Sequence, residues 1–409
     1  MNTISLAEWV AELESGARPK GGIKNGIGEI PSLGAEHLSN DGGFNLQKIK
    51  MIPAEFFRSM RKGHIQKDDI LIVKDGATTG KVSFVSENFP FEEAAINEHV
   101  FRLAVDKQKA NPAFVFRFLQ TPEGQSGIMS DFRGATVGGI GRTFIEKVKV
   151  PDVDRKEQRR VAMILDKADT VRNKRRKVLA LADELLKSSF LEKFGDPVLN
   201  PHGFEMKPLS FLLTGIDSGH SPRCDSRPAK ADEWGILKVS AVSSTVFSMS
   251  ENKAVFSGYQ PRVDHLIKLG DLLFARKNTY ELVGATAIVE VEVKNLAMPD
   301  LIFRLVPNEE EARVPYLWAL LTHNSMRERL REIASGASGS MPNIGKKRLL
   351  DFEVPVPNIN LQEEFSRLYY CIRELKARLK EDCKQADQLF SSLSQRSFTT
   401  GAMEGRYAA

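Results

Sequence analysis

The stretch from Asp69 to Val85 reads DILIVKDGATTGKVSFV, and the stretch from Asp271 to Val289 reads DLLFARKNTYELVGATAIV. Each has an apolar run, then a loop rich in turn-forming residues, then a second apolar run, which is the pattern of two strands joined by a turn. The two stretches begin 202 positions apart, since 271 less 69 is 202. HVFRL, ending at Leu103, matches LIFRL, ending at Leu305, with the same separation. The chain is therefore expected to contain one fold twice.

The match continues on both sides of these strands. GATVGGIGRTFIEKVKVP, from Gly134, parallels GASGSMPNIGKKRLLDFEVPVP, from Gly336, and a GxxP motif occurs at Gly16 and again at Gly219. Short β-rich runs alternate with helical segments in each copy, which favours a mixed α/β (α+β) domain. A length of 409 residues leaves room for two to four domains, and a hydrophobic content of 42% is typical of a folded protein.

A long helical segment closes each copy. Asp154 can cap the first helix, with Glu157 completing a capping box, and Asn360 and Glu363 have the same spacing in the second copy. The apolar residues recur at steps of three and four, as in a coiled coil. In the first helix these are Ile164, Ala168, Val171, Val178, Ala182 and Leu185, with Arg175 interrupting; in the second they are Phe365, Leu368, Ile372, Leu375, Leu379, Ala386, Leu389 and Leu393.

The simplest way to cover two such apolar stripes is to pair the helices. Because each helix follows its own globular domain, antiparallel pairing would give a pseudo-twofold arrangement with a domain at each end. The alternative is that each helix packs only on its own domain. The expected organisation is a first domain over 1–153, a central helix over 154–195, a second domain over 196–359, a C-terminal helix over 360–396 and a tail over 397–409.

The charge is concentrated in one segment. The whole chain has a net charge of +5, whereas Arg155 to Lys177 contains ten basic and three acidic residues, which is +7. This run is a phosphate track, a surface for an acidic partner, or a solvated helix face. The start of the chain lacks the basic and apolar regions of a signal peptide, and no apolar run approaches the roughly 18 residues of a membrane span. A cytoplasmic protein is expected, with Cys224, Cys371 and Cys383 as buried or half-buried thiols.

Two motifs resemble enzyme signatures. GATTGK, from Gly76 to Lys81, has three residues between its glycines where a phosphate-binding loop has four, and Val82 replaces the required Ser or Thr. NPAF, from Asn111 to Phe114, differs by one residue from the NPPF motif with which amino-methyltransferases hold the target amine. Its only candidate cofactor loop, VGGIGR at Val137, precedes a strand-like run. We interpret NPAF as a helix start, with Asn111 as the cap and Pro112 at the first position, where the second copy has Pro315.

No catalytic or metal-binding pattern appears elsewhere. The seven histidines form no HxxxH or HExxH pair, a GxSxG turn is absent, and no paired carboxylates recur in both copies. The sequence therefore favours a binding protein without a catalytic or cofactor site.

The helix from Arg155 to Pro197, RKEQRRVAMILDKADTVRNKRRKVLALADELLKSSFLEKFGDP, resembles the central region of the DNA-specificity subunits of type I restriction-modification systems. The two variable α/β domains, each ending in Val-Pro before a helix that starts with Glu157 and Gln158 or with Glu363 and Glu364, are similar to that family too. The likeness extends over about residues 1–396. The second helix, with FSRLYYCIRELKARL, departs from the pattern.

The resemblance implies a subunit without catalysis. Each globular domain would be a target recognition domain for one half of a bipartite site in double-stranded DNA, and the antiparallel helices would set the gap. Two modification subunits, which bind S-adenosylmethionine and methylate adenine, would dock on the helices. Two restriction subunits that use ATP and Mg²⁺ would complete the complex. The alternatives are a self-contained adenine methyltransferase using NPAF and a structural scaffold that binds no DNA.

Matched positions in the two copies are the best candidates for DNA contacts, because lysine and arginine neutralise phosphates and side chains at loops read base edges. The predicted DNA-binding residues are Lys74, Lys81, Arg276, Lys277 and Asn278, with Arg18 and Arg223 beside the GxxP turns as further candidates.

Overall fold

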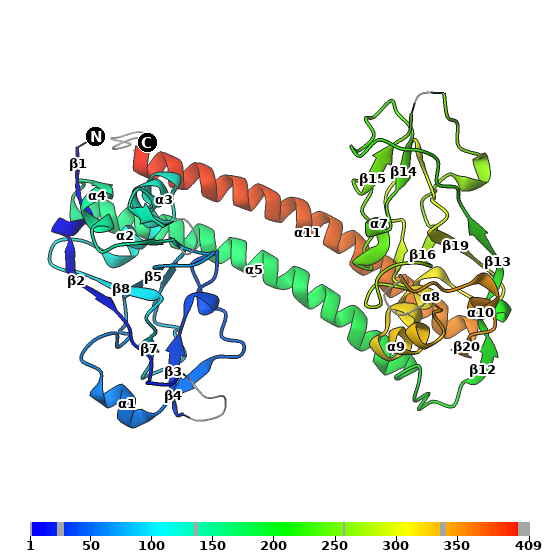
Figure 1. Ribbon diagram of the computed structural model, residues 1–409, viewed down its shortest axis with the longest axis horizontal. Helices are drawn as coiled ribbons and strands as arrows, with labels where there is room; N and C mark the ends of the chain where they lie inside the picture. Colours follow the sequence, from blue (N-terminus) through cyan, green and yellow to red (C-terminus); the bar gives the residue numbers. More distant parts are fainter. Residues whose placement is uncertain (1, 23–27, 135–137, 257, 336–340, 400–409) are drawn as a thin grey trace, which may run out of the picture. The chain divides into compact units, whose positions relative to one another are not determined.

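The computed structural model describes residues 2–22, 28–134, 138–256, 258–335 and 341–399. The chain divides into two compact units, of which unit 1 is Met1–Arg176 with Glu381–Ala409, and unit 2 is Lys177–Lys380. Part of each of two long helices, α5 (Arg155–Phe194) and α11 (Ile359–Thr399), therefore belongs to each unit (Figure 1).

Unit 1 contains a four-stranded antiparallel sheet with the order β2-β8-β5-β6, a three-stranded sheet with the order β4-β3-β7, and two small pairs, β1-β11 and β9-β10. Its strands are β1 (Thr3–Ser5), β2 (Val10–Ser15), β3 (Ile30–Leu33), β4 (Lys50–Ile52), β5 (Ile70–Val73), β6 (Val82–Phe84), β7 (Ala95–Ile96), β8 (Val100–Val105), β9 (Phe132–Arg133), β10 (Gly139–Ile140) and β11 (Lys149–Pro151). Its shorter helices are α1 (Ala54–Ser59), α2 (Pro112–Leu119), α3 (Pro122–Met129) and α4 (Phe144–Lys147).

Unit 2 repeats this plan, with a four-stranded sheet of order β13-β19-β16-β17, a three-stranded sheet of order β15-β14-β18, and the pair β12-β20. Its strands are β12 (Glu205–Pro208), β13 (Leu213–Ser218), β14 (Gly235–Leu237), β15 (Asn252–Ala254), β16 (Leu272–Ala275), β17 (Thr286–Ile288), β18 (Leu296–Ala297), β19 (Ile302–Pro307) and β20 (Glu353–Val356). Its shorter helices are α6 (Leu209–Leu212), α7 (Ser240–Ser243), α8 (Val314–Thr322), α9 (Asn324–Glu332) and α10 (Lys346–Leu350).

The strand register confirms the predicted repeat. Ile70 of β5 is paired with Leu103 of β8, and Leu272 of β16 is paired with Leu305 of β19. Every residue of β5 and β16 is buried, because both faces of these strands are covered. This explains why the two runs are continuously apolar and do not alternate with polar residues.

The same buried ion pair lies beside the central strand of each unit. In unit 1 the Arg102 Nε is 2.6 Å from Asp69 Oδ2, and in unit 2 the Arg304 Nη2 is 2.9 Å from Asp271 Oδ2. Burial raises the pKa of both carboxyl groups despite the arginine beside each. Because a buried pair of this kind is costly to break, it ties the start of the central strand to its neighbour in both copies.

The two long helices run in opposite directions in each unit. In unit 1, Arg175 of α5 donates to the carbonyl of Asp382 and Arg176 pairs with Asp387, so that the N-terminal half of α5 lies along the C-terminal end of α11. In unit 2, Lys376 pairs with Asp183, and Lys193 Nζ is 2.8 Å from Glu364. The antiparallel arrangement of the mixed α/β fold is thus as the sequence predicted.

One predicted helix cap is wrong. Asp154 caps α5, because its Oδ1 accepts from the backbone N of Lys156 and of Glu157. The second helix starts earlier than expected, at Ile359, and its cap is Asn358, which accepts from the backbone N of Leu361 at 2.9 Å. The predicted cap, Asn360, lies inside the first turn.

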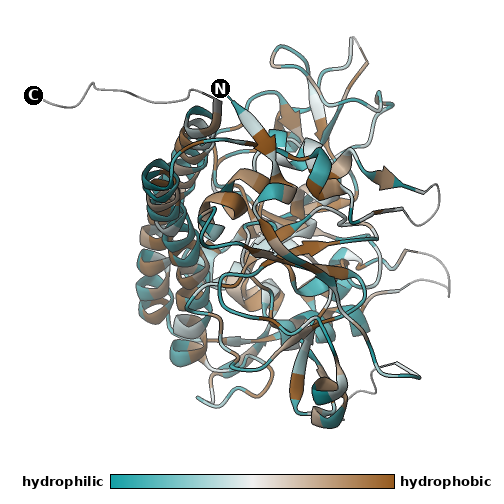
Figure 2. Ribbon diagram, turned by 90° about the vertical axis from the view of Figure 1, so that its left-hand side faces the viewer, coloured by the Kyte–Doolittle hydropathy of each residue, from teal (hydrophilic) through white to brown (hydrophobic). Residues whose placement is uncertain are grey.

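The predicted seam between the long helices is partly wrong. Val171, Val178 and Leu185 of α5 are 48%, 42% and 51% exposed. Leu375 and Leu389 of α11, also predicted to lie in the seam, are exposed as well. Polar and apolar residues alternate along both helices (Figure 2).

Polar residues fill positions in the seam of unit 1, and this is the reason for the error. Asp169 of α5 is 8% exposed and lies 3.0 Å from the Arg117 guanidinium, while the Arg172 guanidinium stacks 4.2 Å from the Phe390 ring of α11. Apolar periodicity alone could not locate a seam built this way. In unit 2 the predicted Ala182 of α5 is buried, and Leu186 is buried in place of the predicted Leu185, one position away.

Of the cysteines, Cys383 is buried and Cys224 is half-buried as predicted, but Cys371 is exposed. Among the described residues, no helix combines the length and apolar character needed to cross a membrane.

Candidate nucleic-acid interface

A basic side chain follows the central strand of each unit and lies over an aromatic ring of the neighbouring strand. The Lys74 Nζ is 5.8 Å from the centre of the Phe101 ring, and the Arg276 guanidinium is 4.8 Å from the centre of the Phe303 ring. The two predicted residues therefore occupy equivalent sites. Each has an apolar stem on the sheet and a cationic end at the edge of the fold.

Acidic groups surround this position in unit 1. Lys74 Nζ donates to the carbonyl of Glu98 at 3.2 Å, and Arg18 Nε is 2.7 Å from the Glu98 carboxylate. Asp75 Oδ2 is 3.8 Å from Lys74 Nζ, and Asp75 Oδ1 is 2.5 Å from His99 Nδ1. Two predicted cations, Lys74 and Arg18, thus meet at Glu98, in a cluster where both signs of charge are present.

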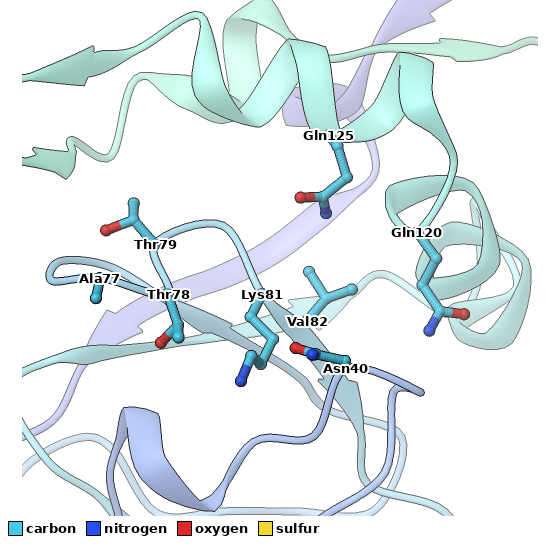
Figure 3. A pocket seen from close by; sticks show the side chains of 8 residues that line it. All are labelled: Asn40, Ala77, Thr78, Thr79, Lys81, Val82, Gln120 and Gln125. Carbon is cyan, nitrogen blue, oxygen red and sulfur yellow. The ribbon is translucent and has the colours of Figure 1, made fainter. Parts of the chain in front are cut away.

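Lys81 is not part of this cluster. Its Nζ donates to the Leu38 carbonyl at 3.1 Å, and the residue lines a pocket of about 420 Å³. The other lining residues are mostly polar: Asn40, Ala77, Thr78, Thr79, Val82, Gln120 and Gln125. Figure 3 shows Gln125 pointing from α3 toward the loop between β5 and β6. The pocket offers amide and hydroxyl groups, which can donate or accept hydrogen bonds.

The GATTGK segment is a tight loop between two strands. Gly80 has a φ of +87°, and a Cβ at this residue would lie 3.0 Å from the Met129 sulfur, so both the backbone conformation and the space favour glycine there. Gln125 Nε2 donates to the Gly80 carbonyl at 3.1 Å. Strand β6 follows Lys81, whereas a nucleotide phosphate-binding loop would lead into a helix.

The corresponding loop of unit 2 carries three predicted residues. Arg276 Nε donates to the side-chain oxygen of Asn343 at 3.0 Å, and Lys277 is exposed and bridges to Asn343 through its backbone. Asn278 Nδ2 donates to the Ser243 hydroxyl at 3.0 Å. The loop is therefore held against two other segments, with the Lys277 side chain free to reach solvent.

Arg223 lies beside an exposed aromatic ring. Its guanidinium is 5.9 Å from the ring of Phe256, which is 51% exposed.

Sequence reasoning missed Asn343 and the arginines of α9. Arg327 Nη2 donates to the Glu281 carbonyl at 2.9 Å, and Arg331 Nη2 donates to the same oxygen at 3.3 Å. A signal for Asn343 was present, because the MPNIGKK segment matches GGIGRT of the first copy. The arginines of α9 have no such signal, since their counterparts in unit 1 are not charged.

NPAF forms a helix start, as interpreted from the sequence. Asn111 Oδ1 accepts from the backbone N of Phe114 at 3.0 Å, and Pro112 begins α2. The Asn111 backbone N donates to Gln158 Oε1 at 2.8 Å. In unit 2, Pro315 occupies the first turn of α8. Val137, where the VGGIGR run begins, lies outside the described residues.

No group of three or more His, Cys, Asp or Glu side chains within the described ranges is arranged to hold a metal ion. Cations, amides and hydroxyls lie on and beside the loops that follow the central strands, where they can form hydrogen bonds with a ligand.

Comparison with known proteins gives one consistent result. Residues 3–180 match the family described as Type I restriction modification DNA specificity domain. The EcoEI specificity subunit of Escherichia coli, a type I restriction enzyme subunit, is 27% identical over 188 residues, which cover 44% of this chain and 31% of that protein. The MjaVIII specificity subunit of Methanocaldococcus jannaschii is 20% identical over 390 residues, which cover 90% of this chain and 85% of that protein.

Comparison with solved structures finds proteins that are described in the same way. The crystal structure of the S subunit of a type I restriction-modification system from M. genitalium superposes with a TM-score of 0.62 at 14% identity, covering 98% of this chain and 96% of that one. The similar proteins are thus named as specificity subunits, in agreement with the expectation from the sequence.

Proposed function

We propose, from the premise that this chain is a relative of the specificity subunits of type I restriction-modification systems, that it is a DNA-recognition subunit and not an enzyme. Each unit reads one half of a bipartite site in double-stranded DNA. The long helices set the gap between the two halves and dock two modification subunits. S-adenosylmethionine is bound by those partners, and ATP and Mg²⁺ by two restriction subunits that complete the complex.

The observation that carries this proposal is the duplicated fold with an equivalent cationic loop in each copy. Lys74 and Arg276 follow matched strands, and each lies over a matched phenylalanine. A protein with two such reading heads is suited to a target in two parts, because binding of one half makes binding of the other effectively intramolecular. The continuous helices α5 and α11 support the ruler role, since each contributes residues to both units.

The alternative of a self-contained methyltransferase has less support. The Asn111 side-chain oxygen caps α2, and its backbone is bound to Gln158, so the NPAF residues serve to start a helix. A scaffold without DNA binding would give no reason for matched cations on the loops of both copies.

The proposal is tested by binding of duplex DNA to the full chain assembled with its modification subunit. We expect an affinity that falls steeply with salt and that depends on the DNA sequence at two separated positions. Equal affinity for all duplexes would contradict a specificity role. Stoichiometric binding of S-adenosylmethionine by the isolated chain would contradict the non-catalytic role.

A further inference from the structure

The backbone pairing of the two units identifies which residues correspond near the cationic loop. The Ile140 backbone N donates to the Lys74 carbonyl, and the Ile344 backbone N donates to the Arg276 carbonyl, both at 2.8 Å. The segment after Ile140 therefore matches the segment after Ile344. In the same way, Asp75 bridges to Gly139 where Lys277 bridges to Asn343.

Five matched positions around the loop differ strongly in charge. Lys74, Asp75, Gln125, Met129 and Arg142 of unit 1 correspond to Arg276, Lys277, Arg327, Arg331 and Lys346 of unit 2. In unit 1, two of the five are positive, one is negative and two are uncharged, which gives a net charge of one. In unit 2 all five are positive. We name the five residues of unit 2 the basic cluster.

The members of the basic cluster are held together by shared neighbours. Lys346 Nζ lies 5.7 Å from the centre of the Phe303 ring, the same ring that Arg276 covers. Arg327 and Arg331 share the Glu281 carbonyl, and the Arg331 guanidinium lies 5.8 Å from the centre of the Tyr280 ring. The loop that carries Arg276 and Lys277 thus joins both groups into one surface.

Carboxylates do not neutralise this surface. In the described part of the chain, none of the five cations forms an ion pair with an acidic side chain, and the hydrogen bonds of their side chains go to backbone carbonyls and to Asn343. Arg327 is only 7% exposed, and its Nη1 has no hydrogen-bond partner among the described residues. Burial and the charge of Arg331 lower the pKa of Arg327 to about 10, so it is still a cation at neutral pH.

The fold itself does not require these charges. At the position of Arg327, unit 1 has Gln125, whose Nε2 donates to the Gly80 and Leu119 carbonyls. At the position of Arg331, unit 1 has the uncharged Met129. A neutral residue therefore satisfies the same packing at these two positions, whereas a buried cation such as Arg327, with no ion-pair partner among the described residues, destabilises a fold unless an anion compensates it. We therefore expect the positive charges of the basic cluster to serve the binding of an anionic ligand.

We infer that the basic cluster of unit 2 binds phosphate groups of the DNA backbone, so that the two units hold DNA unequally. Unit 2 supplies the larger share of the salt-dependent affinity, and the matched site of unit 1 contributes amide and hydroxyl groups. The inference rests on the proposed function, which it makes more specific. DNA phosphates fit because they carry one negative charge per nucleotide along a regular line, and several adjacent cations can each neutralise one.

The test replaces Arg331 and Lys346, two cluster members that are less buried than Arg327, in the double variant R331Q/K346Q. Binding of duplex DNA to the full chain with its modification subunit is measured between 0.05 and 0.2 M salt. Loss of two phosphate contacts should reduce the slope of log affinity against log salt by about 1.8, so that the loss of affinity over this range is about tenfold smaller than for the wild type. Cognate and unrelated DNA should be affected alike.

The matched control is R262Q, which removes a cation of the same unit that is paired with Asp264 and 75% exposed. Its slope should equal that of the wild type, and a circular dichroism melt should show that all variants are folded. If the wild type binds DNA normally and the slope of R331Q/K346Q is unchanged, the inference about the basic cluster is overturned, whereas the proposed function still stands. If the double variant instead no longer assembles with the modification subunit and its slope is unchanged, the cluster binds an acidic protein surface. This result would also overturn the inference about DNA phosphates. If the wild type bound no DNA, the proposed function itself would fail.

Discussion

Single residues show how this chain keeps the same fold in two copies of different sequence. The guanidinium of Arg102 is 4% exposed and contacts Asp69, Glu12 and Glu14, and the guanidinium of Arg304 makes the equivalent bond to Asp271. Burying such a network of charges costs free energy of desolvation. Removing one partner destabilises the fold even more, because the remaining charged groups stay buried without a counter-charge. The pair is therefore a strong constraint on the strand register.

Replacing Arg102 with leucine should destabilise unit 1 by roughly 3–5 kcal/mol, because the buried Asp69 would lose its counter-charge. The expected result in calorimetry is a lower melting temperature for one transition, with the other unchanged. Lys107→Leu is the control, since Lys107 pairs with Asp68 on the surface, where 62% of its side chain is exposed. The loss there should be no more than about 1 kcal/mol. Equal effects of the two substitutions would contradict the importance of the buried pair.

Asp131 gives the fold a dependence on pH. Its side chain is fully buried, accepts from Lys147 Nζ at 2.7 Å and from the Thr143 hydroxyl at 3.0 Å, and the hydrogen bond from Lys147 lowers its pKa. A carboxyl group with a lowered pKa in the folded state adds stability above its unfolded pKa of about 3.9, and this stability is lost as the pH falls through the folded value. Asp131→Asn should therefore be less stable than the wild type at pH 7. Denaturant unfolding should show the two curves converging toward pH 3, and a constant difference would contradict this assignment.

At the scale of elements, the start of each long helix is attached to its domain by a buried glutamine. Gln158 accepts from the Asn111 backbone N and donates to the Val153 carbonyl, whereas Gln362 accepts from the Arg313 backbone N and donates to the Pro357 carbonyl. The two glutamines are 1% and 0% exposed. The amide thus joins three segments, namely the helix, the strand before it and the start of a shorter helix.

Substitution of Gln362 by leucine should leave buried backbone groups without partners, which costs about 1–3 kcal/mol for each unsatisfied group. The measurement is the melting temperature of the full chain, and the matched control is Gln385→Leu at an exposed position of the same helix. A melting temperature of Gln362→Leu equal to that of the control would show that the glutamine is not needed to attach α11.

The strands could be predicted from the sequence, whereas the helix seam and part of the candidate site could not. The strands were predictable because both faces of β5 and β16 are buried, so their apolar runs survive in both copies. The helix seam was not, because the polar Asp169 and Arg172, which are buried and half-buried, lie one position from the predicted Ala168 and Val171. Of the residues discussed for the candidate site, the sequence pointed to Lys74, Arg276 and Lys277, which adjoin matched strands. Arg327, which reaches the loop from a helix distant in the sequence, required the tertiary structure.

At the scale of the whole molecule, the repeat joins two units whose matched loops differ in chemistry. Copies that preserve their buried pairs and glutamines are free to diverge at the loops, because those side chains contribute little to the core. The matched loop positions illustrate this, with Asp75 in one copy and Lys277 in the other. A bipartite target needs such divergence, since its two halves need not have the same sequence.

The proposed ruler role predicts a strong dependence on the gap between the two halves of the DNA site. Inserting two base pairs rotates one half against the other by about 70° and moves it by about 7 Å, given 10 to 10.5 base pairs and 34 to 36 Å per turn. If α5 and α11 fix the gap, the inserted site can engage only one unit at a time, and the affinity should fall by about a hundredfold because the second contact is no longer intramolecular. The measurement is a titration of the full chain with its modification subunit on a site selected from random duplexes. Base changes within the gap that keep its length serve as the control and should leave the affinity unchanged. Equal binding of the original and the lengthened site would show that the helices set no distance, and the ruler role would be rejected while DNA recognition by each unit still stood.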